Sequence, residues 1–332
     1  MKKTALLLLL LLCCLLGLLW PAEARAQDAF PDLTEAESLE MASFMQKNRA
    51  LLQGWYLYTL DYDSDARPVL ARYRLYNGHA AGYTVLAEAC VPQWLCQLDG
   101  RLYYINQENG GVLESVAADG SDRQYIRAGP CSWLSTRDGL LYYCREDGRF
   151  CSMVPGATVE SVLVDDRCFY AYLLDSDTLL YQSDSDGERL HLRSLSSGAD
   201  RALTEGVAYA PLVWGGRLWY TGADGLHSQL PDGSDRRGYA LPPLSGAAEL
   251  LPWGQSLWVR GLTEDGGLRQ WSASLTGDGT VLTSAERGYR LCEFQSARYR
   301  VDALYQLDGR VRGFVLTDFA GNTLRYYMGQ EK

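Results

Sequence analysis

The sequence predicts an all-β fold, a β-propeller in which small four-stranded sheets stand in a ring around a central axis. Three observations predict it. A pattern of aromatic strand and glycine-rich turn recurs along the chain, its period is close to 40 residues, and many of its strands are apolar on both faces. The chain has 332 residues, of which 47% are hydrophobic, so it can bury a large core.

The repeat is clearest in "LWYTGADGLHSQLPDGSDRR", residues 218–237. The turns that precede the aromatic strands end at Gly54, Gly100, Gly139, Asp177, Gly216, Ser256 and Gly309. Successive gaps are 46, 39, 38, 39, 40 and 53 residues, and a period near 40 fits one four-stranded blade. The 279 residues from Gly54 to Lys332 hold seven such units. We therefore favour seven blades; in the alternative of six, the first copy supplies one closing strand.

The strands are short aromatic and β-branched runs bounded by Asp-Gly, Gly-Gly and Ser-Gly turns. Glycine adopts the left-handed backbone conformation freely and Asp and Asn tolerate it, which explains why they gather at these hairpins. Runs such as "LLYY" and "RLWY" are apolar on both sides. A propeller strand is covered by neighbouring blades on both faces, so this composition favours a propeller over a one-sided sheet.

Residues 1–26 have the layout of a secretory signal peptide: two lysines, an apolar run from Ala5 to Trp20, then Ala-x-Ala cleavage sites. An uncleaved membrane anchor is the alternative, because the run is long enough to span a bilayer. Residues 27–53 form the expected lead-in, with a short helix over residues 33–52. The propeller domain is expected over residues 54–332. We therefore expect an exported protein, extracellular or associated with the cell envelope, monomeric, and without a membrane span once the signal peptide is removed.

The formal net charge is −10, and −12 without residues 1–26. Like charge repels phosphate, so the composition disfavours nucleic acid and anionic membrane surfaces as partners.

Nine cysteines are present, and seven follow residue 26. An odd number at irregular spacing does not form a disulfide framework. In "CREDGRFC", a two-residue Asp147-Gly148 turn would place Cys144 opposite Cys151. That register allows a disulfide between them without favouring it, because the pair would occupy a hydrogen-bonded site, where the Cα atoms are about 5.5 Å apart.

The strand "LWYT" and the turn "DGSDR", repeated in "LESVAADGSDRQ", resemble a blade of the YWTD propellers of the LDL-receptor class. The chain is most similar to bacterial exported proteins of unknown function described as LRP1-like β-propellers. The resemblance covers residues 54–332 and implies the propeller fold. Gly222 stands where the motif has its Asp, so the resemblance does not extend to receptor-type function.

Catalytic motifs are not evident in the sequence. His79, His191 and His227 occupy non-equivalent positions in different repeats, and nucleophile-elbow, zinc-protease and P-loop patterns are lacking. "QSDSDGERLHLR" has Gln and Arg where a calcium loop needs Asp and Glu, which indicates a hairpin turn. We expect no cofactor, no metal and no enzymatic activity. The alternative is a propeller hydrolase or lyase acting on glycans or lactones.

The candidate binding face is the mouth of the central channel. Trp94 and Trp133 each lie six residues before an Asp-Gly glycine, so they occupy equivalent places, and Tyr172 lies one position off in the next repeat. Glu146 and Asp147 belong to an acidic rim of turns on the same face. Aromatic rings beside acids suit a protein, peptide or glycan ligand, particularly a cationic one. The sequence therefore predicts a binding or scaffolding module whose ligand is unknown.

Overall fold

The computed structural model describes residues 49–76, 79–241, 244, 248–253, 256–262, 264, 268–274, 282–284, 290–295, 299–305, 311–318 and 323–328. Every regular element within these ranges is a β-strand, which confirms the all-β class. The expected signal peptide and the lead-in up to residue 48 lie outside the described residues.

The strands fall into consecutive runs of four, which we call units. The first three units comprise β1 (Ala50–Gln53), β2 (Tyr56–Tyr62), β3 (Pro68–Tyr76), β4 (His79–Glu88), β5 (Cys96–Leu98), β6 (Arg101–Asn106), β7 (Val112–Ala117), β8 (Gln124–Arg127), β9 (Cys131–Arg137), β10 (Leu140–Arg145), β11 (Phe150–Met153) and β12 (Ser161–Val164). The later units comprise β13 (Cys168–Leu173), β14 (Thr178–Ser183), β15 (Arg189–Ser194), β16 (Asp200–Ala202), β17 (Tyr209–Trp214), β18 (Arg217–Gly222), β19 (Gly225–Gln229), β20 (Arg237–Tyr239), β21 (Glu249–Trp253), β22 (Ser256–Leu262), β23 (Leu268–Ser274), β24 (Leu282–Ser284), β25 (Arg290–Gln295), β26 (Tyr299–Tyr305), β27 (Val311–Asp318) and β28 (Thr323–Met328).

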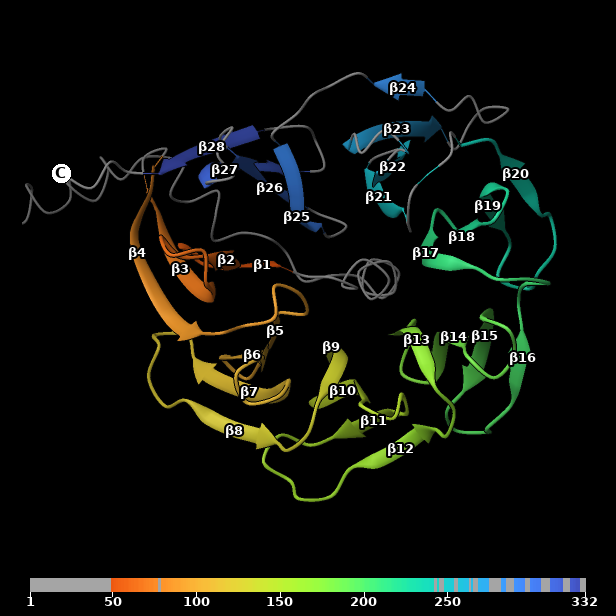
Figure 1. Cartoon of the computed structure of the whole chain (residues 1–332), viewed down its shortest axis with the longest axis horizontal. Helices are drawn as coiled ribbons and strands as arrows, with labels where there is room; N and C mark the ends of the chain where they lie inside the picture. The colour runs from red at the N-terminus through yellow and green to blue at the C-terminus, as the bar shows by residue number, and fades with distance from the viewer. Residues whose placement is uncertain are drawn as a thin grey trace, which may run out of the picture.

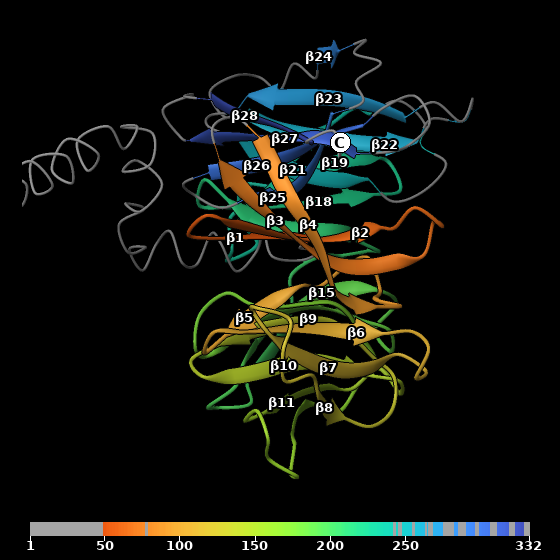
Figure 2. The ribbon, with the colours of Figure 1, turned by 90° about the vertical axis from the view of Figure 1, so that its left-hand side faces the viewer.

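Neighbouring strands within a unit pair antiparallel, so each unit is a meander of hairpins. Five units form separate four-stranded sheets, and the first and last are joined into one sheet with the order β1-β2-β3-β4-β28-β27-β26-β25. The units stand around a ring, with the first strand of each toward the middle and the fourth outside (Figure 1). Seen from the side, they lie in stacked layers (Figure 2).

The two ends of the described chain meet at the junction of the first and last units. Strand β28 pairs with β4 in parallel, with Tyr327 opposite His79 and Met328 opposite Ala80. This pairing covers an edge of the last unit that would otherwise present unpaired backbone groups.

Two expectations near the chain ends are corrected. Ala50–Gln53, the last part of the expected helix and its flank, is strand β1, because its backbone pairs with β2 and Ala50 is fully buried there. Gly309 was expected to follow the first strand of the last repeat, but it lies between β26 and β27 in chain order. The connection between the first and second strands of the last unit, β25 and β26, instead follows Gln295. It lies about 40 residues after the equivalent connection at Ser256, so the last repeat has the same period as the others.

The hydrophobic core is divided into clusters that lie between neighbouring sheets. Along β10, Leu141 and Tyr143 pack into the cluster shared with the preceding unit, whereas Tyr142 and Cys144 pack into the one shared with the following unit. All four are buried. Successive side chains of a strand point to opposite faces, so a strand covered on both sides must be apolar throughout. This explains the runs that are apolar on both faces.

The hairpin turns also dock neighbouring units together. The carbonyl oxygens of Gly111 and Gly148 accept hydrogen bonds of 2.9 Å from the backbone N–H groups of Cys131 and Cys168, which begin the first strands of the next units. Ala208 donates in the same way to Glu188 at 3.1 Å. In these three units the turn after the second strand therefore fixes where the next inner strand begins.

The repeated "DGSD" turns serve the fold. The Arg101 guanidinium donates to the Ser115 hydroxyl at 3.1 Å and to Asp122 at 2.6 Å. Arg217 makes the same two bonds, at the same distances, to Ser228 and Asp235. The "DGSD" turn that carries the sequence resemblance thus accepts hydrogen bonds from an arginine in the second strand of the same unit.

Candidate functional site

Three aromatic residues from neighbouring inner segments form a continuous row. The ring centroids of Trp94 and Trp133 lie 5.5 Å apart, and those of Trp133 and Tyr170 lie 5.0 Å apart. Trp94 lies two residues before β5, Trp133 is in β9 and Tyr170 is in β13. All three residues are half-buried. We call Trp94, Trp133 and Tyr170 the aromatic row.

Each residue of the aromatic row has a left-handed backbone. The φ angles are 65° at Trp94, 56° at Trp133 and 48° at Tyr170. Bulky side chains rarely adopt this conformation, which costs of order 1–3 kcal/mol per residue. In β9 and β13 the cause is a bulge, because one extra residue of the inner strand stands opposite the second strand. The next unit has the same bulge, with Ala210 at φ 47°.

The structure brings Trp94 and Trp133 together but corrects the place of Tyr172. Tyr170, not Tyr172, occupies the position equivalent to Trp133. Tyr172 is 4% exposed, and its ring packs edge-on against Trp133 at 6.1 Å. Counting back from the turn fails here because three residues separate the hydrogen-bonded Leu174 and Thr178. The equivalent turn between β9 and β10 has only two residues, Asp138 and Gly139.

Tyr170 was missed, although the sequence carried a signal for it. The first strands "CSWL" and "CFYA" both begin with a cysteine, Cys131 and Cys168, and the aromatic residue follows two positions later. Alignment on the start of the inner strand, which the turn of the preceding unit fixes, would have paired Tyr170 with Trp133 directly.

The two acids predicted for the site have different surroundings. Asp147 bonds the Arg145 guanidinium at 2.8 Å, and its other oxygen accepts from the Arg149 backbone N–H at 3.1 Å, so it stabilises its own turn. The Glu146 side chain is exposed and makes neither a hydrogen bond nor an ion pair to the described residues. It borders a pocket that also touches Trp133. Of the two acids, Glu146 alone faces a space that a ligand could fill.

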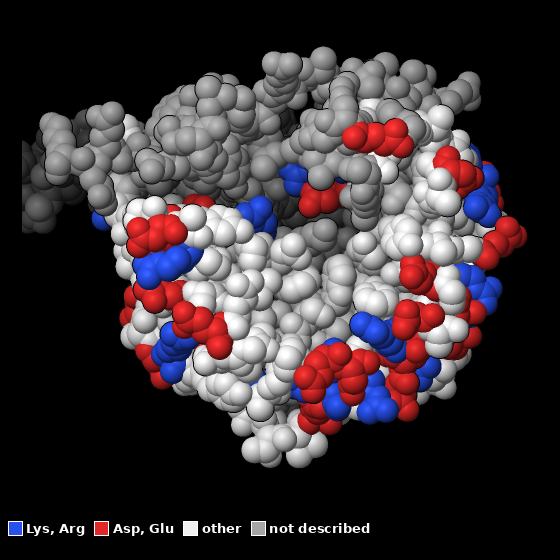
Figure 3. All heavy atoms as spheres, viewed as in Figure 1, with Lys and Arg blue, Asp and Glu red and all other residues white. Residues whose placement is uncertain are grey.

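Two other acids in turns on the same face are paired with basic side chains. Asp186 is bonded to Arg189 and His191, and Asp224 contacts His227 at 2.7 Å. Basic and acidic atoms alternate toward the perimeter of the face in Figure 3, and the surface nearer the middle, over β5 and β9, is largely uncharged. The surface over β5 and β9, which we call the centre of the face, is therefore largely uncharged, with a mixed-charge border.

The expected facing of Cys144 and Cys151 is wrong. Cys144 lies opposite Phe150, and Cys151 opposite Tyr143. The turn contains three residues, Glu146 to Gly148, and not two, which shifts the register by one and sends the two thiols to opposite faces of the sheet. Both cysteines are free and buried.

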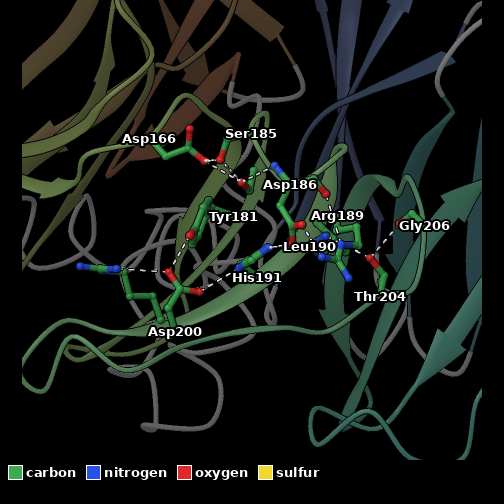
Figure 4. Close-up of polar contacts among 12 residues, drawn as sticks. Asp166, Tyr181, Ser185, Asp186, Arg189, Leu190, His191, Asp200, Thr204 and Gly206 are labelled. Carbon is green, nitrogen blue, oxygen red and sulfur yellow. Dashed lines mark hydrogen bonds and ion pairs between the residues drawn. The ribbon is translucent and has the colours of Figure 1, made fainter.

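A cluster of polar side chains surrounds His191 (Figure 4). Its Nδ1 lies 2.9 Å from Asp200 and its Nε2 lies 2.6 Å from Asp186, while the Tyr181 hydroxyl donates to Asp200 at 2.6 Å. Ser183 and Ser185 bond Asp166 instead of the imidazole. Both imidazole nitrogens are occupied by carboxylates, so the cluster ties strands β14, β15 and β16 together and offers no activated nucleophile.

Within the described ranges, no group of three or more His, Cys, Asp or Glu side chains is placed to hold a metal ion. The same part of the chain has no helix that is long and apolar enough to cross a membrane.

No family model matches the chain, and no curated protein matches it. Solved structures do resemble it. The dihydro-heme d1 dehydrogenase NirN in complex with DHE has a TM-score of 0.56 at 16% identity over 83% of this chain, which spans 65% of the NirN chain. The AfRom2 CNH domain has a TM-score of 0.55 at 11% identity, covering 80% of this chain and 93% of that one. A structure of YCF48 bound to D1 peptide has a TM-score of 0.51 at 11% identity, covering 87% and 96%. These likenesses show the fold: the chain is a β-propeller.

Proposed function

We propose that this protein is a non-enzymatic binding propeller that holds a peptide segment of a partner protein against the aromatic row. The observation that carries the proposal is the left-handed backbone shared by Trp94, Trp133 and Tyr170. Glycine would relieve the strain at each position, yet each position holds a large ring. Strained residues cluster at binding and catalytic sites, where the surrounding structure holds them in place.

The chemistry of the aromatic row suits a peptide. Half-buried rings at 5.0–5.5 Å separation present apolar faces and edges to a ligand and add about 0.5–1.5 kcal/mol per aromatic contact beyond area burial. The uncharged centre of the face suits apolar side chains, and its mixed-charge border suits their polar neighbours. The similar structure of YCF48 holds a peptide, which supports this ligand class.

The proposal includes the finer features expected from the sequence. The propeller has seven blades, supported by the runs of four strands from β1 to β28. It is a monomer that is exported after cleavage near residue 26, and it is related to the bacterial LRP1-like propellers.

The catalytic alternative, a hydrolase or lyase acting on glycans or lactones, gains no support from the geometry. All three histidines lie in the described residues, and none bonds a Ser, Thr or Cys side chain there.

A displayed library of random peptides, selected on the immobilised protein, tests the proposal. Selected peptides should bind the unaltered chain and lose at least tenfold in affinity with Trp94→Ala or Tyr170→Ala. Tyr125→Ala is the control, because that ring is 58% exposed on the outer strand β8. Peptides that bind all three variants equally would contradict the proposal. Capture on a glycan array with no selected peptide would also overturn it, in favour of a carbohydrate ligand.

A further inference from the structure

A pocket of about 240 Å³ lies between the third and fourth units, at the inner end of the turn that joins β10 and β11. Its walls come from the start of β9, from that turn and from the start of β13. Trp133 is the only member of the aromatic row that lines it. The volume is below the roughly 300–1,000 Å³ of pockets for drug-sized ligands, so it suits a molecule about as large as one amino acid.

Two charged side chains at this pocket have no oppositely charged partner in the described residues. Glu146 has none, as noted above. Arg167 is exposed and makes no ion pair, and its guanidinium lies 5.4 Å from the centre of the Phe169 ring. The nearby arginines differ: Arg145 bonds Asp147 and Glu160, and Arg149 bonds Asp165 at 2.6 Å. One free cation and one free anion therefore border the same small cavity.

The turn holds Arg167 in place. A Cβ atom at Gly148 would lie 2.2 Å from the Arg167 Cγ and 2.9 Å from its Cα, so the arginine stem lies directly against the glycine. The Arg167 carbonyl oxygen also accepts a 3.0 Å hydrogen bond from the Asp184 N–H. Side chains that are positioned before binding lose less freedom when a ligand arrives.

Arg145 also lines the pocket, with its charge paired to Asp147 and Glu160, and the other walls are uncharged. Trp133 and Phe169 supply rings, and Cys131, Cys144 and Cys168 supply thiols. Burial raises the pKa of the Cys131 thiol to about 12 and raises those of Cys144 and Cys168 as well, so all three are neutral at physiological pH. Buried neutral thiols behave as small apolar groups.

We propose that this pocket binds a small zwitterion of the α-amino-acid class with an apolar side chain. Arg167 holds the α-carboxylate, Glu146 holds the α-ammonium group, and the rings and thiols contact the side chain. Charge-assisted hydrogen bonds are the strong ones, and here the two ligand charges meet two unpaired protein charges. This is a second site with a different ligand from that of the peptide site, and the two sites share only Trp133.

Calorimetric titration with three probes tests it on the unaltered chain. The probes are L-phenylalanine, N-acetyl-L-phenylalanine, which lacks the cation, and L-phenylalaninamide, which lacks the carboxylate. Phenylalanine should bind, and each derivative should bind about tenfold more weakly or worse, because each loses one charge-assisted contact. Three probes of equal affinity, or no heat from phenylalanine up to about 10 mM, would overturn the proposal.

Two substitutions test which protein side chain contacts each charged group of the ligand. Arg167→Gln should abolish the preference for phenylalanine over phenylalaninamide and keep the preference over the N-acetyl compound, and Glu146→Gln should do the reverse. Arg149→Gln, an ion-paired arginine of the same turn that does not line the pocket, should change neither preference. If both pocket variants retain both preferences, the assignment is wrong. Binding of the selected peptides should be unaffected by Arg167→Gln, so the two proposals can fail separately.

Discussion

The indole rings of Trp94 and Trp133 lie 5.5 Å apart, although the two residues belong to different units and are 39 positions apart in the chain. Trp133 also touches Tyr170 and Tyr172, so it is the residue on which the aromatic row depends. Trp133→Ala should lower the free energy of unfolding by about 2–3 kcal/mol, below the 3–5 kcal/mol typical of fully buried rings, because Trp133 is half-buried.

Comparison of two truncations isolates the backbone strain at Trp133. Alanine keeps the cost of φ 56°, whereas glycine does not, so Trp133→Gly should be more stable than Trp133→Ala by about 1 kcal/mol. Urea unfolding of both variants measures the difference. A glycine variant that is the less stable of the two would show that the left-handed conformation is not strained.

The contact between Gly148 and Arg167 gives a further prediction. Gly148→Ala places a Cβ 2.2 Å from the Arg167 Cγ in addition to the cost of φ +87°, whereas Gly139→Ala, at φ +76°, meets nothing within 4 Å. Both variants should lose about 1 kcal/mol to strain, and Gly148→Ala should lose a further 1 kcal/mol or more. Equal thermal melting of the two variants would contradict the packing described for the turn.

The thiols of the described chain should be unreactive in the folded state. Burial raises the pKa of Cys151 to about 11 and that of Cys131 to about 12, and the thiolate is the reactive form. Iodoacetamide at pH 8 should therefore modify Cys90, Cys96, Cys131, Cys144, Cys151 and Cys168 only after denaturation. Peptide mass spectrometry reads this directly, and a linked Cys144–Cys151 peptide would contradict the register.

The cluster around His191 predicts a response to acid. Burial alone would raise the pKa of Asp200, but the bonds from Tyr181, His191 and Arg193 outweigh it and hold that pKa below its ordinary 3.8. A lowered folded-state pKa stabilises the protein above the unfolded pKa, and this contribution is lost as the pH falls through the folded value. The stability difference between the unaltered chain and Asp200→Asn should therefore be full at pH 6 and shrink below about pH 4.

The control for this experiment is Asp65→Asn, whose carboxylate is 70% exposed. Denaturant unfolding across the pH range should show no comparable trend for it. If the stability difference between the unaltered chain and Asp200→Asn grows as the pH falls, the Asp200 carboxylate is not stabilised by these bonds.

The parallel pairing of β28 with β4 predicts that the chain ends stabilise each other. Removal of residues 322–332 deletes β28 and exposes the edges of β4 and β27, so the whole ring should melt at a lower temperature. Removal of residues 329–332 alone, which keeps β28, is the control. Equal melting of the first truncation and the full chain would show that this junction contributes nothing to stability.

The sequence was sufficient for the all-β class and the period, because strand composition and turn residues are local properties. It correctly indicated that strands such as Leu140–Arg145 are covered on both faces. It misplaced Gly309, because in a repeat of four strands an Asp-Gly turn after the second strand looks like one after the first.

The candidate site could be predicted only in part, because its alignment depended on the lengths of the turns. Trp94 and Trp133 could be aligned by counting from equivalent two-residue turns, whereas the longer loop after β13 displaced the count and concealed Tyr170. The register of Cys144 depended on whether its turn held two residues or three, which "EDG" alone does not decide. Whether Arg167 and Glu146 have oppositely charged partners depends on contacts between units, so no local sequence pattern could have shown that they lack them.

Hydrogen exchange on the complex with a selected peptide locates the partner most directly. Protection should appear in residues 91–98, 131–137 and 168–173, which carry the aromatic row and its strands. The competing surface is the apolar outer edge at Val154, Val159 and Val162, which are 55%, 76% and 46% exposed. Slower exchange in the three inner segments, absent with Tyr170→Ala, is the predicted result, and protection confined to residues 154–164 would contradict binding at the aromatic row.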